Sequence, residues 1–192
     1  MRLIMKVDKR KLILKAVEEV IKTKRFHEVK MEDVAKEAGV GKGTIYRYFP
    51  NKDELYFELA VSGFDSIKDD VLEISSSISN YAEKFLKLTQ RMETFFLTRK
   101  TISRVMREIE TRYEEDNSPR FLIIQQHKMD LRNQIAVVMQ EGLENNLLSL
   151  PFTSAQYAEF WIHQLIGLSH WPNDIAKPEL QTIIDLHLKK YF

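Results

Sequence analysis

Cysteine is absent from the 192 residues, so the chain can form no disulfide bond and no metal site with thiolate ligands. Long apolar runs are absent as well: the longest, Ile135–Met139, is far shorter than the roughly 20 residues that cross a bilayer. The opening residues, MRLIMKVDKRK, hold too few apolar side chains before Asp8 for a secretory signal. We therefore expect a soluble cytoplasmic protein that binds no metal, carries no cofactor and does not enter a membrane.

Glycine and proline are scarce: six glycines and five prolines leave few positions at which the chain can turn. Apolar residues recur at spacings of three and four, and no segment of useful length shows the period of two that strands have. The pattern predicts an all-α fold, with three short helices in the first part of the chain and about six longer helices after them. We expect the domain boundary between residues 1–50 and residues 51–192.

Capping residues and helix breakers place the ends of these helices. The expected helices cover about residues 8–25, 31–38, 42–49, 51–74, 80–98, 101–115, 119–145, 154–170 and 178–191. Gly39 ends the second helix, and Pro50 ends the third because the residue before a proline avoids the α region. Asn51 caps the fourth helix, and Ser118 with Pro119 opens the long one that follows.

The charge is distributed unevenly along the chain. Residues 1–52 contain 14 Lys and Arg against 7 Asp and Glu, a net charge of +7, whereas the remaining residues contain 15 against 21, a net charge of −6. A basic first quarter ahead of an acidic remainder indicates two tasks, one of which is binding a polyanion such as nucleic acid. The alternative is chance clustering of solvated charge.

Residues 31–50 fit a helix-turn-helix. Ala35 is small enough for two helices to cross closely, and Gly39 can adopt the left-handed conformation of a sharp turn at low cost. The apolar anchors that such a unit needs are Val34, Ala38, Val40 and Ile45. An ordinary helical hairpin has the same packing needs, so these residues alone do not distinguish the two.

The outer face of the second helix favours DNA binding. It carries Lys42, Thr44, Tyr46, Arg47 and Tyr48, followed by Lys52. No acid occurs between Lys42 and Lys52, and the N–H groups at the start of a helix favour a phosphate. Gly43 inside a helix costs about 1 kcal/mol relative to alanine. Close approach to a nucleic-acid backbone would explain its presence.

The segment FHEVKMEDVAKEAGVGKGTIYRYFPNKDELYFELA resembles the DNA-binding signature of the TetR/AcrR family of bacterial transcriptional regulators. The resemblance covers about residues 8–61. It implies a recognition helix that carries Lys42, Gly43, Thr44, Tyr46, Arg47 and Tyr48. It also implies that phosphates are held by Thr44, Tyr46 and Lys52, and that base edges are reached by Lys42, Arg47 and Tyr48. Two departures are Gly41 and Lys30–Met31, which replace the Ser or Thr caps that are common in the family.

The same resemblance implies a homodimeric repressor that binds a near-palindromic operator in double-stranded DNA and is released by a small hydrophobic effector. The alternative is a DNA-binding protein of the same fold that acts through a protein partner without a small ligand. The sequence contains no nucleophile elbow, no phosphate-binding glycine loop after a strand and no HExxH motif. We therefore do not expect an enzyme.

Two apolar stripes near the end of the sequence are candidates for a dimer interface, which the family builds from two helices of each subunit. The first stripe contains Phe160, His163, Gly167 and His170. The second contains Leu180, Ile184, His187 and Tyr191. The alternative is that both stripes face the core of their own chain.

An effector pocket is expected among the helices of residues 80–170. The candidate lining residues are Met92, Phe95, Phe96, His127 and Trp161. Aromatic and methionine side chains at helical spacing are more often ordinary core residues, and a single histidine is usually a structural group, so both interpretations stay open.

Overall fold

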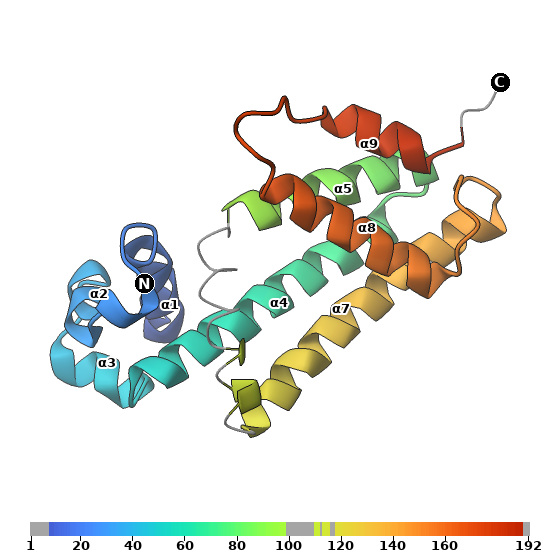
Figure 1. Ribbon diagram of the computed structural model, residues 1–192. Coiled ribbons are helices and arrows are strands. Elements are labelled where there is room, and N and C mark those ends of the chain that lie inside the picture. Colours follow the sequence, from blue (N-terminus) through green and yellow to red (C-terminus); the bar gives the residue numbers. More distant parts are fainter. Residues whose placement is uncertain (1–7, 99–109, 112, 116–117, 190–192) are drawn as a thin grey trace, which may run out of the picture. The chain divides into compact units, whose positions relative to one another are not determined.

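The computed structural model describes residues 8–98, 110–111, 113–115 and 118–189, and the elements named in them are all helices (Figure 1). They are α1 (Lys9–Val20), η1 (Phe26–Glu28), α2 (Met31–Glu37), α3 (Lys42–Tyr48), α4 (Lys52–Ser77), α5 (Tyr81–Thr98), α7 (Pro119–Glu144), α8 (Ser154–Ser169) and α9 (Leu180–His187). The predicted all-α class is confirmed for this described part. The helix expected over residues 101–115 lies largely outside it.

Contacts within the chain divide it into two compact units. The N-terminal unit comprises Met1–Ser62 and Thr101–Phe121, and the C-terminal unit comprises Gly63–Lys100 and Leu122–Phe192. Two of the three divisions, after Ser62 and after Phe121, fall inside helices, so α4 and α7 each contribute residues to both units. The domain boundary expected between residues 50 and 51 stays a prediction.

The N-terminal unit is built on capped helices with apolar inner faces. The carboxylate of Asp8 accepts hydrogen bonds from the backbone N–H groups of Arg10 and Lys11, at 3.0 and 3.4 Å, which begins α1. Helix α1 packs against α2, and α2 packs against α3. The fully buried residues of this unit include Ile13, Val17, Ile21, Val34, Ile45, Phe49 and Leu55. Their burial removes a continuous apolar surface from water and so stabilises the unit.

Other predicted caps are present. The side-chain oxygen of Asn51 accepts a hydrogen bond from the N–H of Glu54 at 2.8 Å, and α4 follows. The hydroxyl of Ser118 accepts one from the N–H of Arg120 at 3.3 Å, at the start of α7. Helix α1 ends at Val20, earlier than expected.

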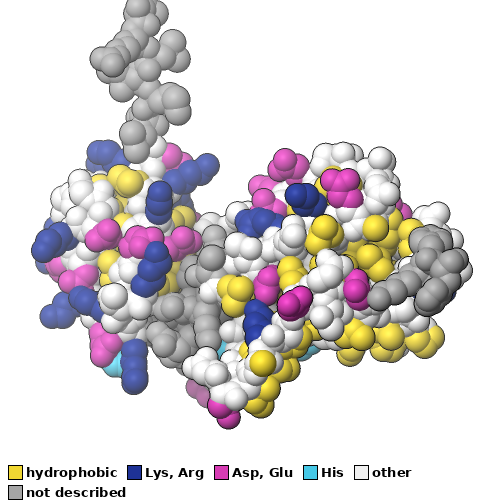
Figure 2. Space-filling view, turned by 90° about the horizontal axis from the view of Figure 1, so that it is seen from above, with side chains coloured by type: hydrophobic (Ala, Val, Ile, Leu, Met, Phe, Trp, Pro, Cys, Tyr) yellow, Lys and Arg dark blue, Asp and Glu magenta, His cyan; other side chains and the backbone are white. Residues whose placement is uncertain are grey.

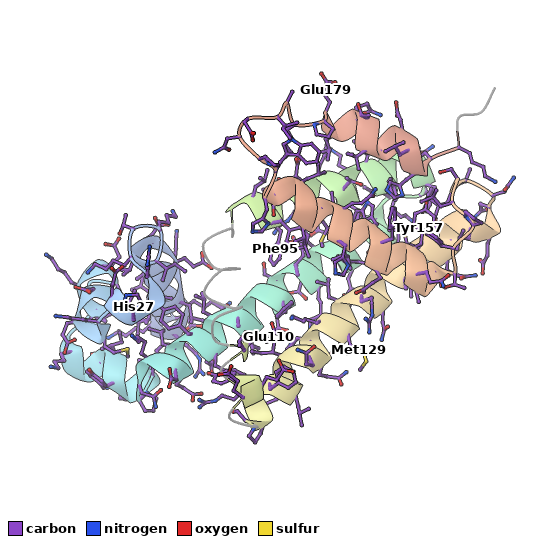
Figure 3. The ribbon with its side chains drawn as sticks, viewed as in Figure 1. His27, Phe95, Glu110, Met129, Tyr157 and Glu179 are labelled. Carbon is purple, nitrogen blue, oxygen red and sulfur yellow. The ribbon has the colours of Figure 1, made fainter. Side chains whose placement is uncertain are left out.

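In the C-terminal unit, α5 packs against α8 and α9 around buried aromatic side chains. Phe85 of α5 lies with its ring centre 5.9 Å from that of Trp161 and 5.7 Å from that of His187. Tyr157, in the first turns of α8 (Figure 3), lies 5.3 Å from His187. One aromatic cluster therefore joins all three helices.

The last helix differs from its prediction, which was residues 178–191. Helix α9 begins at Leu180 and ends at His187, because the backbone beyond His187 pairs with the segment before α8. Leu188 forms an antiparallel bridge with Leu148, and the N–H of Ser149 donates to the carbonyl of His187 at 2.8 Å. A pairing between residues so far apart leaves no periodic signal in the sequence.

Replacing Gly142 with alanine should destabilise the C-terminal unit. A methyl group at this α7 position would overlap the ring and hydroxyl of Tyr81, which is 6% exposed. Overpacking of this kind typically costs about 1–3 kcal/mol. We expect Gly142→Ala to lower the free energy of unfolding in urea by that amount.

Gly167→Ala is the matched control, because this α8 glycine has no atom within 4 Å of an added methyl group. It should leave the free energy of unfolding unchanged or raise it, since alanine favours a helix more than glycine does. Equal losses from the two substitutions would contradict the close packing of Gly142 on Tyr81.

Candidate functional site

Helices α2 and α3 form a helix-turn-helix around a left-handed glycine. Gly39 has φ +62°, a conformation that residues with a side chain rarely adopt. The N–H of Val40 donates to the carbonyl of Ala35 at 2.9 Å, which closes the turn at the end of α2. Ala35 and Ile45 are buried, at 4% and 0% exposure. The predicted turn is therefore present, with Gly39 in the conformation that its place in the sequence indicated.

The burial of Ile45 fixes which side chains of α3 meet solvent. Lys42, Tyr46 and Arg47 are exposed, whereas Thr44 and Tyr48 are half-buried. Lys42 places its ammonium 6.0 Å from the centre of the Tyr46 ring. Arg47 places its guanidinium 5.4 Å from the centre of the Tyr48 ring. The predicted DNA-binding residues of α3 thus form two cation–aromatic pairs on one short helix.

Glycines occupy the N-cap position of α3 and the second position within it. Gly41 is the N-cap residue and offers no side chain to cap the helix. Gly43 is exposed, and a methyl group added to it would meet no atom within 4 Å. Packing within the chain therefore gives no reason for a glycine at position 43.

Lys52, predicted to bind a phosphate, stands at the start of α4 and already has a partner in the protein. Its ammonium donates a hydrogen bond to the carbonyl of Val29 at 3.3 Å. A lysine ammonium has three donors, so this bond leaves it able to donate to a phosphate as well. The bond also ties the start of α4 to the segment before α2.

Sequence reasoning missed one charged residue of this surface, Glu32. This residue lies in the first turn of α2, and its Oε1 is 2.7 Å from the ammonium of Lys42. The hydrogen bond from Lys42 lowers the pKa of the Glu32 carboxyl below its ordinary value, and the same bond raises the pKa of Lys42. The two residues are ten positions apart on different helices, so only the crossing of α2 and α3 brings them together.

The residues predicted for a dimer interface differ in how far they are exposed to solvent. Phe160, His163 and Gly167 of α8 are exposed, as is His170 directly after it, and Leu180 is half-buried. Ile184 and His187 of α9 are buried, at 2% and 0% exposure, and therefore face the core of their own chain. Tyr191 lies outside the described residues. The rings of Phe160 and His187 are 6.1 Å apart, so the exposed face of α8 adjoins α9.

His187 belongs to a buried polar cluster. Its Nδ1 lies 3.1 Å from the hydroxyl of Tyr157, and its Nε2 lies 2.5 Å from Oε1 of Gln164. Burial lowers the pKa of His187 to about 4, because the charged imidazolium loses its hydration. The imidazole is therefore neutral at physiological pH.

Each residue predicted to line an effector pocket has its own neighbouring side chains. Met92 and Trp161 are fully buried, and the indole N–H of Trp161 has no hydrogen-bond acceptor among the described residues. Phe95, near the end of α5 (Figure 3), packs edge-on against Phe96 with ring centres 5.5 Å apart. His127 of α7 is half-buried.

The neighbours of His127 come from α4. Its ring stacks on Phe64 at 6.1 Å, and its Nδ1 lies 3.2 Å from the ammonium of Lys68 and 3.4 Å from Oδ1 of Asp65. An open groove elsewhere in the C-terminal unit includes none of the predicted effector residues. It is lined by Glu73, Ile74, Ser77, Ile78, Lys87, Gln90, Arg91 and Thr94.

Two further classes of site are absent from the described ranges. None of the helices there is both long enough and apolar enough to cross a membrane. Among the same residues, no group of three or more His, Cys, Asp or Glu side chains is placed to hold a metal ion.

Comparison with known sequences finds a family model that matches the region of the helix-turn-helix. The model of "Bacterial regulatory proteins, tetR family" matches residues 13–59. An uncharacterized HTH-type transcriptional regulator of Bacillus subtilis, YhgD, is 39% identical over 74 residues, which are 37% of this chain and 39% of that protein. The alignment therefore spans about two fifths of the relative's length.

Solved structures share the whole fold. The fatty acid degradation regulator FadR from Bacillus halodurans aligns with a TM-score of 0.71 at 20% identity, over 92% of this chain and 90% of that one. AibR, in complex with isovaleryl coenzyme A and operator DNA, aligns with a TM-score of 0.67 at 15% identity, over 93% and 95%. At these identities the likeness shows the fold alone.

The buried His187 should make the fold less stable in acid. Its pKa in the folded state is below the ordinary value of 6.5, so an unfolded chain takes up a proton that the folded chain does not. Stability from the neutral imidazole is thus lost as the pH falls from about 6.5 towards 4. Between pH 7 and pH 5 we expect a loss on the order of 2 kcal/mol in the free energy of unfolding.

His187→Gln isolates this effect, because glutamine can hydrogen-bond but does not titrate. Urea unfolding at pH 7 and pH 5 should show a smaller decrease for the variant than for the original protein. The same decrease in both would contradict a buried neutral His187.

Proposed function

Since this chain belongs to the TetR family of bacterial regulatory proteins, we propose that it is a sequence-specific DNA-binding transcriptional regulator. The observation that carries the proposal is the outer face of α3, where Lys42, Tyr46 and Arg47 are exposed over a buried Ile45. Lys and Arg side chains are spread over the N-terminal unit (Figure 2), as electrostatic attraction to phosphates requires.

Within α3, we assign different roles to different side chains. Arg47 and Lys42, together with Tyr48, contact base edges in the major groove, where an Arg or Lys on guanine is the commonest specific contact. Thr44, Tyr46 and Lys52 hold phosphates and so set the register of the helix on DNA. Gly43 lets the backbone of α3 approach the duplex, which agrees with the open space around it.

A homodimer is proposed because one helix-turn-helix reads only half of a near-palindromic operator. Two recognition helices must lie about 34 Å apart to enter successive major grooves. The exposed apolar residues at the junction of α8 and α9 support a two-fold interface there: Phe160 is 40% exposed and Leu186 is 57% exposed. Hydrophobic side chains gather along one edge of the C-terminal unit (Figure 2). The buried side chains of Ile184 and His187 belong to the core beneath the junction of α8 and α9.

A small hydrophobic effector is proposed to release the dimer from DNA. The names of FadR, a fatty acid degradation regulator, and of AibR, bound to isovaleryl coenzyme A, make acyl compounds the first class to test. The buried indole N–H of Trp161, which has no acceptor among the described residues, could donate to a polar atom of such a ligand. Met92, Phe95, Phe96 and His127 are the other proposed contacts.

Helix α4 is the element through which an effector would act, because its residues belong to both units. Near its start, Glu54 pairs with Arg120 of α7, and Glu58 pairs with Arg10 of α1. These ion pairs tie α4 to its neighbours within the N-terminal unit. The effector must bind the conformation that does not bind DNA more tightly than the one that does, since equal affinity shifts no equilibrium.

Arg47→Ala should reduce binding at particular base pairs. We expect a loss of roughly 1–3 kcal/mol at the positions that Arg47 contacts, and little change at others. Fluorescence anisotropy would measure affinity for an operator selected from random duplexes and for single-base variants of it. A uniform loss on all duplexes would show that Arg47 contacts phosphate only.

Lys52→Ala is the comparison variant for phosphate binding. It should weaken all duplexes alike and reduce the slope of log affinity against log salt concentration by about 1. An unchanged slope would exclude a phosphate contact.

Leu186→Glu should weaken the proposed dimer, because it replaces an exposed apolar side chain of the proposed interface with a charged one. We expect the dimer dissociation constant, measured by analytical ultracentrifugation, to rise at least about tenfold. Leu72→Glu is a matched control on α4, since Leu72 is similarly exposed, at 53%. A dimer that tolerates Leu186→Glu as well as Leu72→Glu would place the interface elsewhere.

A further inference from the structure

We propose that Glu32 competes with DNA for Lys42 and thereby limits non-specific binding by α3. This inference rests on the proposed DNA-binding function and adds a residue that sets its selectivity. The ammonium of Lys42 lies 2.7 Å from the Glu32 carboxylate and 6.0 Å from the centre of the Tyr46 ring. Lys42 therefore already has an ion-pair partner in its own chain before DNA binds.

The hydrogen bond to the N-cap backbone of α2 comes from Asp33 rather than from Glu32. Asp33, its neighbour, accepts a hydrogen bond from the N–H of Lys30 at 3.2 Å and pairs with Lys24 at 2.7 Å. Asp33 thus caps the helix and joins it to the segment that follows α1. The side chains of Glu32 and Lys42 are 49% and 68% exposed, so the bond between them is also open to solvent.

An exposed ion pair of this kind is weak, so a nucleic-acid phosphate or base can displace Glu32. The displacement breaks the ion pair between Glu32 and Lys42, and the loss of that pair opposes binding. On an operator, directed hydrogen bonds from Lys42 to base edges offset this cost. On DNA of another sequence, Lys42 can contact only phosphates. The free energy that it gains by leaving Glu32 for a phosphate is therefore small.

The pair therefore acts more strongly against non-specific complexes than against the specific one. Non-specific affinity comes almost entirely from cations that neutralise phosphates. Specificity is a difference between two affinities, and it increases when the unwanted complex is opposed. Glu32 reduces the number of cations available for the unwanted complex by one.

Glu32→Gln tests the proposal, because glutamine keeps the size of the side chain and removes its charge. We expect affinity for a scrambled duplex to increase about threefold to tenfold at low salt, with a salt slope steeper by about 1. Affinity for the selected operator should increase less, so the ratio of the two affinities falls. Thermal unfolding should stay unchanged, since Asp33 remains the cap.

Glu19→Gln is the matched control for charge. Glu19 pairs with Lys22 in the same unit, so this variant makes the same change in net charge and releases a lysine that is not on α3. A small and equal effect of Glu19→Gln and Glu32→Gln on scrambled DNA would overturn the proposal, because net charge would then explain both.

Glu32→Gln in a Lys42→Met background separates competition from direct repulsion. If Glu32 acts through Lys42, the substitution has no further effect once Lys42 is absent. If the full increase persists, Glu32 repels DNA directly and the competition is disproved. Absence of DNA binding by the original protein would instead contradict the proposed function itself, so the two failures are distinguishable.

Discussion

The burial of Ile45 in the N-terminal unit determines the orientation of α3, and the proposed DNA-binding surface depends on that orientation. Ile45 is inaccessible to solvent, and the helix is short enough that one buried residue sets its rotation. Gly39, with φ +62°, makes the turn that lets α3 cross α2 with this face inward. Lys42, Tyr46 and Arg47 face solvent as a consequence.

The cations of this surface all have partners in the absence of DNA. Lys42 pairs with Glu32, Lys52 donates to the carbonyl of Val29, and Arg47 lies against the ring of Tyr48. In the proposed complex, binding to DNA is therefore an exchange of partners, in which each of these side chains leaves or shares an existing contact. Under this proposal the strength of each internal contact contributes to selectivity, since a specific complex replaces the contact fully and a non-specific one does not.

Local features of the fold could be predicted from the sequence, because their causes are local. Asn51 and Ser118 cap helices, and Gly39 ends one, for reasons that lie within four residues of each. The pairing of Glu32 with Lys42 and of Leu148 with Leu188 joins distant segments, and no periodic pattern records it. Helical spacing grouped Ile184 and His187 with Leu180, but spacing alone does not determine whether a stripe faces the core or a second subunit.

The central claim is that α3 is the surface that meets DNA. The most direct measurement is the change in backbone amide NMR signals when the selected operator duplex is added to the protein. We predict that the largest changes fall on residues 41–48 and on the first turn of α4. Unchanged signals in α3, with the largest changes on α8 or α9, would contradict the claim.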